Sequence, residues 1–362
     1  MADRINVTRS YSPPAEEYQQ YVSKILETSV FTNNGPYLQK LEKELKDYLN
    51  VPYLQFVTNG TVAIQLALRA LGITEGEIIT TPFSYVATTS AILWERCSPV
   101  YVDIEPNSFC INPELIESAI TPKTRAILAV HVFGIPCNTE AIADIGNKHG
   151  IPVIYDAAHA FGCVYKGKSL LSYGDVSTCS FHATKLFHTI EGGAVICRDE
   201  AVHKRADLAK RFGHNGDDHY CLGINAKASE LQAAMGLCNL PHVKEIIADR
   251  KKSVELYDSL FQGKFQRPIL PEGLEYNYSY YPVVFKSEEE LLQVKETLES
   301  ENIFIRRYFY PTLNKLPYLD KYYPCPVSED VSNRIACLPL YYGLEKDVIS
   351  KIVSLIIKGY FI

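Results

Sequence analysis

Three short segments carry the reactive side chains of this sequence. Lys185 ends the segment 180–185, Ser-Phe-His-Ala-Thr-Lys, and a Gly-Gly pair follows at 192–193. Asp156 ends an apolar stretch and precedes Ala-Ala-His-Ala, while residues 59–61 are Asn-Gly-Thr. A lysine with a lowered pKa is a nucleophile and a base, a buried carboxylate needs a cationic partner, and a helix start offers backbone N–H groups to an anion. Together the segments would provide an amine, a carboxylate and an anion site.

Each segment also has an ordinary structural interpretation. Asn59 and Asp156 are common N-cap residues, and most lysines only keep a protein surface hydrated. Lys185 is less ordinary, because it lies between a short apolar strand and the Gly-Gly turn. The residue types alone leave both interpretations open for Asn59 and Asp156.

Alternating helix and strand periodicities over residues 36–200 would position these segments. Helices are predicted at 36–50, 62–71, 86–95, 113–120 and 138–149, and strands at 54–57, 78–80, 99–102, 126–130, 153–155 and 195–197. Such alternation predicts an α/β fold with a mainly parallel sheet covered by helices on both faces. Ligands bind at the carboxyl ends of such strands, so we expect the three reactive segments to meet there.

The pattern changes after residue 227 and predicts a second domain. Helices are expected at 227–237, 243–260 and 288–300, with a strand at 281–285. We therefore predict a large domain over residues 1–245 and a smaller C-terminal α+β domain over residues 246–362. The tyrosines of this part either stack on a nucleotide base or pack within the domain; they lie at 276–281, 322 and 323.

Composition excludes several classes of protein. The chain has 362 residues, and its 36 Lys and Arg against 42 Asp and Glu give a net charge of −6 at pH 7. Apolar residues make up 47% and charged residues 22%, which is typical of a soluble globular enzyme and not of a disordered chain. No clustered basic segment is present, so we expect no nucleic-acid partner.

The sequence also predicts the compartment and the absence of a metal. Met1 to Arg4 precede no apolar segment of a signal peptide, and no apolar stretch approaches the roughly 20 residues of a membrane span. The ten cysteines are scattered without a CxxC pair, which favours reduced thiols over disulfides or zinc. No dinucleotide-binding or P-loop motif occurs. We expect a cytoplasmic protein with neither a metal nor a membrane association.

The reactive segments resemble those of the fold type I pyridoxal-phosphate (PLP) enzymes, and more closely those of the nucleotide-sugar aminotransferases. The resemblance covers nearly the whole chain. It rests on the order and spacing of the segments 58–61, 82–88, 156–160, 180–185, 191–193, 223–227, 230–234, 307–311 and 338–340. The fold that it implies is a fold type I PLP-transferase.

The resemblance implies a role for each residue around the cofactor. Lys185 would bind the aldehyde of PLP covalently and then, as a free amine, move a proton. Asp156 would pair with the pyridine nitrogen, His159 would lie near the phenolic oxygen, and Tyr85 would stack on the ring. The implied phosphate ligands are Gly60, Thr61, Ser180 and, from the neighbouring subunit of a homodimer with active sites at its interface, Asn225.

The resemblance also implies a substrate. Related sugar dehydratases have histidine in place of Lys185, so the lysine favours transamination. The motif around it, with Arg306 to Pro311, is similar to that of transaminases that make TDP-4-amino-4,6-dideoxy-D-glucose from TDP-4-keto-6-deoxy-D-glucose. The donor would be L-glutamate, released as 2-oxoglutarate, within deoxysugar biosynthesis such as that of the lipopolysaccharide O-antigen. Candidate substrate residues are Asn33, His182, Lys227, Arg306, Arg307 and Tyr310; the two arginines and Lys227 are the candidate cations for glutamate.

Several alternatives stay open at this point. His182 is either a substrate or proton-relay residue or a structural histidine. The reaction could instead be amination at C3 of the sugar, or that of another enzyme of the same fold such as a small-amino-acid lyase. A non-catalytic binding relative is the third hypothesis, and the intact Lys185, Asp156 and Thr61 argue against it.

Overall fold

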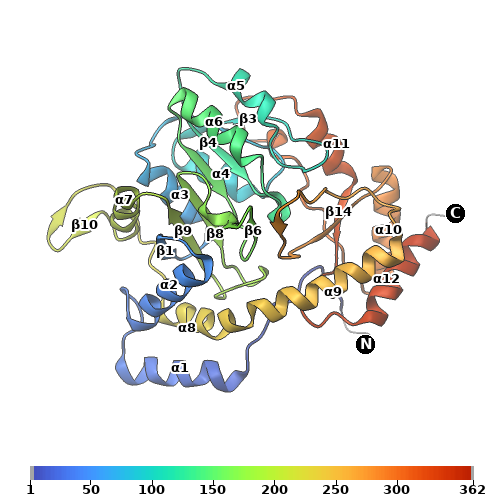
Figure 1. The fold of residues 1–362 in the computed structure, drawn as a ribbon, viewed down its shortest axis with the longest axis horizontal. Coiled ribbons are helices and arrows are strands. Elements are labelled where there is room, and N and C mark those ends of the chain that lie inside the picture. Colours follow the sequence, from blue (N-terminus) through green and yellow to red (C-terminus); the bar gives the residue numbers. More distant parts are fainter. Residues whose placement is uncertain (1–3, 360–362) are drawn as a thin grey trace.

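A seven-stranded sheet forms the centre of the computed structural model, which describes residues 4–359 (Figure 1). The outermost residues of the two predicted domains, 1–3 and 360–362, lie outside the described part. In sheet order the strands are β1 (Tyr53–Val57), β9 (Gly193–Cys197), β8 (Val176–Ser180), β5 (Val153–Asp156), β4 (Thr124–Val130), β2 (Gly76–Thr80) and β3 (Cys97–Tyr101). Strand β9 runs antiparallel to both of its neighbours, β1 and β8, and the other pairs of this sheet are parallel, so the prediction of a mainly parallel sheet is confirmed.

Helices cover both faces of this sheet, as predicted. Along β9, Ala194 and Ile196 pack in the core beneath α2 (Pro36–Leu49) and α8 (Glu230–Asn239). The alternate residues Val195 and Cys197 pack in the core beneath the other group of helices. These helices are α3 (Gly60–Ala70), α4 (Val86–Trp94) and α7 (Glu200–Lys210).

Further helices, 3-10 turns and a hairpin complete this part of the chain. Helix α1 (Ala15–Thr28) packs against α8, and α6 (Thr139–His149) covers β5. The helix predicted at 113–120 is a 3-10 turn, η1 (Pro113–Leu115), followed by the short α5 (Ile116–Ala119). Two further 3-10 turns are η2 (Val132–Gly134) and η3 (Leu170–Ser172). A hairpin of β10 (His214–Asn215) and β11 (Asp218–His219) extends away from the body at the left of Figure 1.

The C-terminal part has a core of its own. The turn η4 (Leu240–His242) leads into α9 (Val243–Phe261), which packs with α10 (Glu288–Ser300) and α12 (Lys346–Gly359) around Tyr257, Leu291 and Ile352. Strand β13 (Tyr281–Val284) pairs antiparallel with β14 (Ile335–Leu338). The turn η5 (Leu313–Lys315) and α11 (Pro326–Arg334) lie between them in sequence. The predicted boundary at residue 245 falls inside α9, and the division into two domains stays a prediction.

A small three-stranded sheet joins the C-terminal part of the chain to the part that contains the central sheet. β12 (Leu274–Glu275) pairs with β6 (Val164–Tyr165), which pairs with β7 (Lys168–Ser169). Residues 276–280 continue from β12 towards the central sheet. These residues contact the loops that follow β5 and β8, because Asn277 bonds to the His159 carbonyl and Tyr280 bonds to Lys185.

Candidate active site

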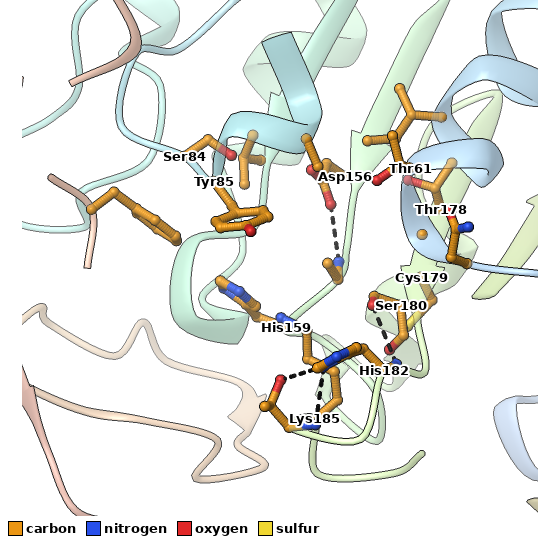
Figure 2. Close-up of a pocket in the computed structure, with 18 of the residues that line it drawn as sticks. Thr61, Ser84, Tyr85, Asp156, His159, Thr178, Cys179, Ser180, His182 and Lys185 are labelled. Atoms are coloured by element: carbon orange, nitrogen blue, oxygen red, sulfur yellow. Dashed lines mark hydrogen bonds between the residues drawn. The ribbon is translucent and has the colours of Figure 1, made fainter. Parts of the chain in front are cut away.

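A cavity of about 240 Å³ opens at the carboxyl ends of the central strands. Its walls come from the segments that follow β1, β2, β5 and β8, so the reactive segments meet where the sequence predicts. Figure 2 shows Tyr85 and His159 on one side and Thr61, Thr178 and Ser180 on the other. The predicted site residues that line this cavity are Gly60, Thr61, Tyr85, Asp156, His159, Ser180, His182, Lys185 and Arg306.

Asp156 is a buried carboxylate that is held by two donors. The Thr88 hydroxyl donates to Oδ2 over 2.8 Å, and the Ala158 N–H donates to Oδ1 over 3.1 Å. Burial raises the pKa of Asp156, while these hydrogen bonds and the charge of Lys185 lower it. A carboxylate has about four acceptor sites, so Asp156 can accept a further donor from the cavity.

His159 is locked in one protonation state. The backbone N–H of Phe133 donates to Nδ1 over 3.2 Å, so in the neutral ring the proton is on Nε2. Burial, with a smaller contribution from the charge of Lys185, lowers the pKa of His159 well below its usual value. The ring lies nearly parallel to the rings of Phe133 and Phe309, at centroid distances of 6.2 and 5.7 Å. His159 is therefore a neutral residue with one fixed N–H donor.

Lys185 is partly buried and lines the cavity. Burial lowers the pKa of its amine, and the nearby Tyr308, Asp156, Cys179 and Tyr85 act in the opposite direction. Its Nζ donates a hydrogen bond to the Tyr280 hydroxyl over 3.3 Å. A lowered pKa increases the fraction of neutral amine, which is the form that acts as a nucleophile or a base.

The start of α3 forms an anion cradle. Asn59 caps this helix, because its side chain accepts the N–H of Val62. The Asn59 carbonyl accepts the N–H of Ala63. The N–H groups of Gly60 and Thr61, in the first turn of the helix, have no acceptor in the described part of the chain. A Cβ on Gly60 would lie 2.8 Å from the Cβ of Ser180, so only glycine allows the helix this close. Both interpretations of Asn-Gly-Thr, N-cap and anion cradle, are compatible with this geometry.

His182 lies at the rim of the cavity and is partly exposed. Its Nδ1 is 2.8 Å from the Thr184 hydroxyl, and its Nε2 is 3.6 Å from Oε1 of Glu191. Glu191 lines the same cavity. The side chain is thus available to a ligand, although it also has partners of its own.

Five predicted site residues do not line this cavity. Arg307 donates to Glu288 over 2.7 Å and to the Asn333 carbonyl over 3.0 Å, and its guanidinium lies 3.4 Å from the centre of the Tyr310 ring. Lys227 lies over the ring of Phe212. The remaining two, Asn33 and Asn225, are exposed.

The structure adds three residues to those that the sequence predicts. Thr88 orients Asp156, Tyr280 contacts Lys185, and Tyr308 lines the cavity beneath the guanidinium of Arg306, 4.6 Å from the ring centre. The tyrosines of 276–281 are buried or partly buried and do not line this cavity; whether any of them stacks on a nucleotide base stays a prediction. Tyr322 is exposed and donates to Glu329.

Metal ligands, membrane-spanning helices and disulfides are the other features about which the sequence makes predictions. Within residues 4–359, no group of three or more His, Cys, Asp or Glu side chains is arranged to hold a metal ion. Over the same residues, no helix combines the length and the apolar character that crossing a membrane requires. All ten cysteines are free thiols, and nine of them are buried.

Comparisons with known proteins agree with this arrangement. Residues 14–357 match the sequence profile of the DegT/DnrJ/EryC1/StrS aminotransferase family. The chain is 40% identical to a dTDP-4-amino-4,6-dideoxy-D-glucose transaminase of Shigella dysenteriae, over 98% of this chain and 99% of the relative. It is 34% identical to a UDP-2-acetamido-2-deoxy-3-oxo-D-glucuronate aminotransferase of Pseudomonas aeruginosa, over 86% and 87%.

The fold also matches a solved structure over its full length. A crystal structure of DesI in the presence of its TDP-sugar product has a TM-score of 0.93 and 28% sequence identity. The match covers 100% of this chain and 94% of the other. The predicted α/β fold, that of the nucleotide-sugar aminotransferases, is thereby confirmed.

Proposed function

This chain belongs to the DegT/DnrJ/EryC1/StrS aminotransferase family and is an aminotransferase, and we propose that it aminates a nucleotide-linked keto-sugar with the help of PLP. The proposed acceptor is TDP-4-keto-6-deoxy-D-glucose, the product is TDP-4-amino-4,6-dideoxy-D-glucose, and the donor is L-glutamate. The observation that carries the proposal is the convergence of Lys185, Asp156 and the α3 cradle in one cavity. The full-length identity of 40% to a transaminase of this type supports the choice of sugar.

The proposed reaction balances without an external oxidant. Glutamate loses its amino group and its α-hydrogen, takes up an oxygen from water and leaves as 2-oxoglutarate, so this carbon is oxidised. The keto-sugar gains an amino group and a hydrogen at C4 and loses its carbonyl oxygen as water, so that carbon is reduced. The two half reactions use the same cavity in turn, which is a ping-pong scheme.

The described residues fit PLP. The cradle at Gly60, where a Cβ would meet Ser180, suits a phosphate group, with N–H groups from Gly60 and Thr61 and hydroxyls from Thr61 and Ser180. Asp156 can accept the N–H of a protonated pyridine ring. The Nε2–H of His159 suits the phenolic oxygen, and the exposed ring of Tyr85 suits the face of the ring.

PLP supplies a carbonyl that exchanges with amines and a protonated ring that withdraws electrons from the bond being broken. The chain's own residues provide the rest. Asp156 keeps the ring nitrogen protonated, and the α3 cradle fixes the phosphate. Lys185, whose pKa burial lowers, accepts and returns the proton at the reacting carbon.

We assign the donor carboxylate to Arg306. This arginine lines the cavity, and no carboxylate lies within ion-pair distance of it among residues 4–359. Arg307 is already paired with Glu288, and Lys227 lies beside Phe212 on the hairpin side of the molecule. The other predicted substrate residues stay predictions; they are Asn33, His182 and Tyr310.

We further propose a homodimer with active sites at the interface. The hairpin and its flanks, residues 212–225, expose the apolar side chains of Phe212, Tyr220, Leu222 and Ile224. Exposed apolar side chains gathered on one projecting segment favour a protein partner. Asn225 follows them, is exposed, and does not line the cavity of its own chain, which supports its predicted contact with the phosphate in a second copy.

Product analysis tests the proposed function. The purified chain is supplied with PLP, L-glutamate and a panel of TDP-, UDP- and GDP-linked keto-sugars, and NMR assigns the carbon that carries the new amine. We expect amination at C4 of TDP-4-keto-6-deoxy-D-glucose, borohydride fixation of the cofactor on Lys185, and no turnover by Lys185→Ala. Turnover by that variant would refute the assignment of Lys185.

A C3 aminotransferase is the second candidate, because one relative with 34% identity is named as acting on a 3-oxo sugar. An amine at C3 in the same NMR experiment would favour it.

The proposed location of the protein is the cytoplasm, which the ten free thiols support. The O-antigen as the destination of the sugar, and closure of the C-terminal domain over it, remain part of the proposal.

A further inference from the structure

Tyr280 is the one side chain seen to accept a hydrogen bond from the amine of Lys185 in the described structure. The distance from Nζ to the hydroxyl oxygen is 3.3 Å, and Tyr280 is only 6% exposed. We propose that Tyr280 is a positioning residue: it holds the amine of Lys185 whenever this lysine is free, and so fixes the point from which the amine moves a proton.

The chain builds a rigid support for Tyr280. Residues 276–280 are tied to the loops of the large part around Phe133 and His159. The Tyr276 hydroxyl donates to the Phe133 carbonyl over 2.8 Å, and the Asn277 amide donates to the His159 and Phe161 carbonyls over 2.8 and 2.9 Å. These bonds join the segment that carries Tyr280 to the loop that follows Asp156.

The neighbouring residue Ser279 is tied down as well. Its hydroxyl donates to the His159 carbonyl over 3.3 Å, and its own carbonyl accepts from Nη1 of the buried Arg250 over 3.0 Å. Arg250 comes from α9, so both parts of the molecule fix the backbone on which Tyr280 stands. A side chain supported in this way can hold a defined distance to Lys185.

The ring and the hydroxyl of Tyr280 are defined too. The ring lies 4.7 Å from the His159 ring and 5.7 Å from that of Tyr308, measured between centroids. Burial raises the pKa of Tyr280, although Arg250 and Arg306 act against this, so the hydroxyl keeps its proton at neutral pH. A neutral hydroxyl oxygen can accept an N–H from the amine and also from the ammonium form.

Other charged and titratable groups face Lys185 from every side, and the test has to separate Tyr280 from them. These groups are Asp156 at the end of β5, Cys179 in β8, Tyr85 before α4, His159, and Tyr308 from the C-terminal part. The hydroxyl of Tyr280 differs from them because it makes the direct hydrogen bond. Removing it alone leaves the other groups in place.

The test measures the pKa of Lys185 without using catalysis. The full-length, cofactor-free chain is acetylated at a series of pH values, and mass spectrometry follows the peptide that contains Lys185. Tyr280→Phe removes an acceptor that favours the charged form, so we expect the pKa of Lys185 to fall by about one unit. The matched control Tyr173→Phe loses a tyrosine hydroxyl that bonds to the Tyr165 carbonyl, outside the segment that carries Tyr280, and should leave the Lys185 profile unchanged. An unchanged profile in Tyr280→Phe overturns the proposal.

A second measurement covers the case in which Tyr280→Phe does not fold. Site-specific 3-fluorotyrosine at position 280 keeps the shape of the side chain and weakens the oxygen as an acceptor. We expect a smaller downward shift in the pKa of Lys185; no shift in the folded fluorinated chain would also count against the proposal.

The catalytic consequence rests on the proposed transamination. In the PLP-loaded enzyme we expect Tyr280→Phe to lower kcat about tenfold and to change the KM for glutamate and for the keto-sugar less than about twofold, because proton transfer depends on the position of the amine. A rise in both KM values with an unchanged kcat would contradict a positioning role. If the loaded wild type is inactive, the proposed function fails, whereas the acetylation profile still decides the role of Tyr280.

Discussion

The hydroxyl of Thr88 donates a 2.8 Å hydrogen bond to Oδ2 of Asp156, although the two residues are 68 positions apart in the chain. Thr88 itself is 2.8 Å from the Ser84 hydroxyl, and all three side chains are buried. The hydroxyl pair thus orients the carboxylate from the start of α4. It also stabilises the ionised form, which is the form that can pair with a protonated ring nitrogen.

Thr88→Val removes this donor and keeps the shape of the side chain. We expect the pKa of Asp156, which burial already raises, to rise further, so that the acid limb of the rate profile moves to higher pH. We also expect kcat to fall about tenfold. The matched control is Thr89→Val, since Thr89 is equally buried but bonds to Tyr101. Equal loss of activity in both variants would show that only helix packing matters.

The sequence predicts the sheet and the meeting point of the reactive segments, because both follow from local patterns. Apolar periodicity identifies the strands, and the rule that ligands bind at carboxyl ends places Asp156 and Lys185 together. The helix at 288–300 is predicted with the bounds that the structure has. The helix predicted at 62–71 instead begins at Gly60, because the side chain of Asn59 caps it there.

What the sequence does not predict depends on contacts between distant positions. Tyr280 and Lys185 are 95 positions apart, and nothing local distinguishes Tyr280 from the other tyrosines around it. The same holds for the two adjacent arginines: Arg307 is paired with Glu288 from α10, and Arg306 is directed to the cavity. Residues of this kind have no motif, so only the folded chain separates them.

Gly60→Ala tests the phosphate cradle. The added Cβ would lie 2.8 Å from that of Ser180 and would push the start of α3 away from it. We expect the affinity for PLP, measured by absorbance titration of the cofactor-free chain, to fall about tenfold or more. Gly146→Ala is the matched control, because its Cβ would lie 2.8 Å from the Ile151 carbonyl, away from the cavity. That variant should lose stability and keep its affinity; a similar loss in both would rule out a local effect.

The lowered pKa of Glu329 predicts that the free energy of unfolding decreases at acidic pH. Burial raises its pKa, but donors from Lys315, Tyr322 and Asn314 outweigh this and hold the pKa at about 2. The folded value lies below the unfolded one, so the stabilisation is full above about pH 4.5 and is lost as the pH falls towards 2. We expect Glu329→Gln to lower the free energy of unfolding by about 1–3 kcal/mol near neutral pH. In urea unfolding, the difference should shrink near pH 3. Glu301→Gln, at an exposed pair with Lys351, is the control and should change stability little.

Arg306→Ala and Arg307→Ala distinguish the two candidate cations for the donor. Arg306 lines the cavity and lies over Tyr308, so its loss leaves a glutamate carboxylate without its cation. We expect the KM for glutamate to rise about 30-fold, which corresponds to about 2 kcal/mol, and the KM for the keto-sugar to change less than about threefold. Arg307→Ala breaks the bonds to Glu288 and the Asn333 carbonyl, so it should lower the melting temperature and leave the KM for glutamate nearly unchanged. Arg306→Lys should recover part of the affinity, because an ammonium keeps the charge and loses the planar fork. A larger effect of Arg307→Ala than of Arg306→Ala on the KM for glutamate would reverse the assignment.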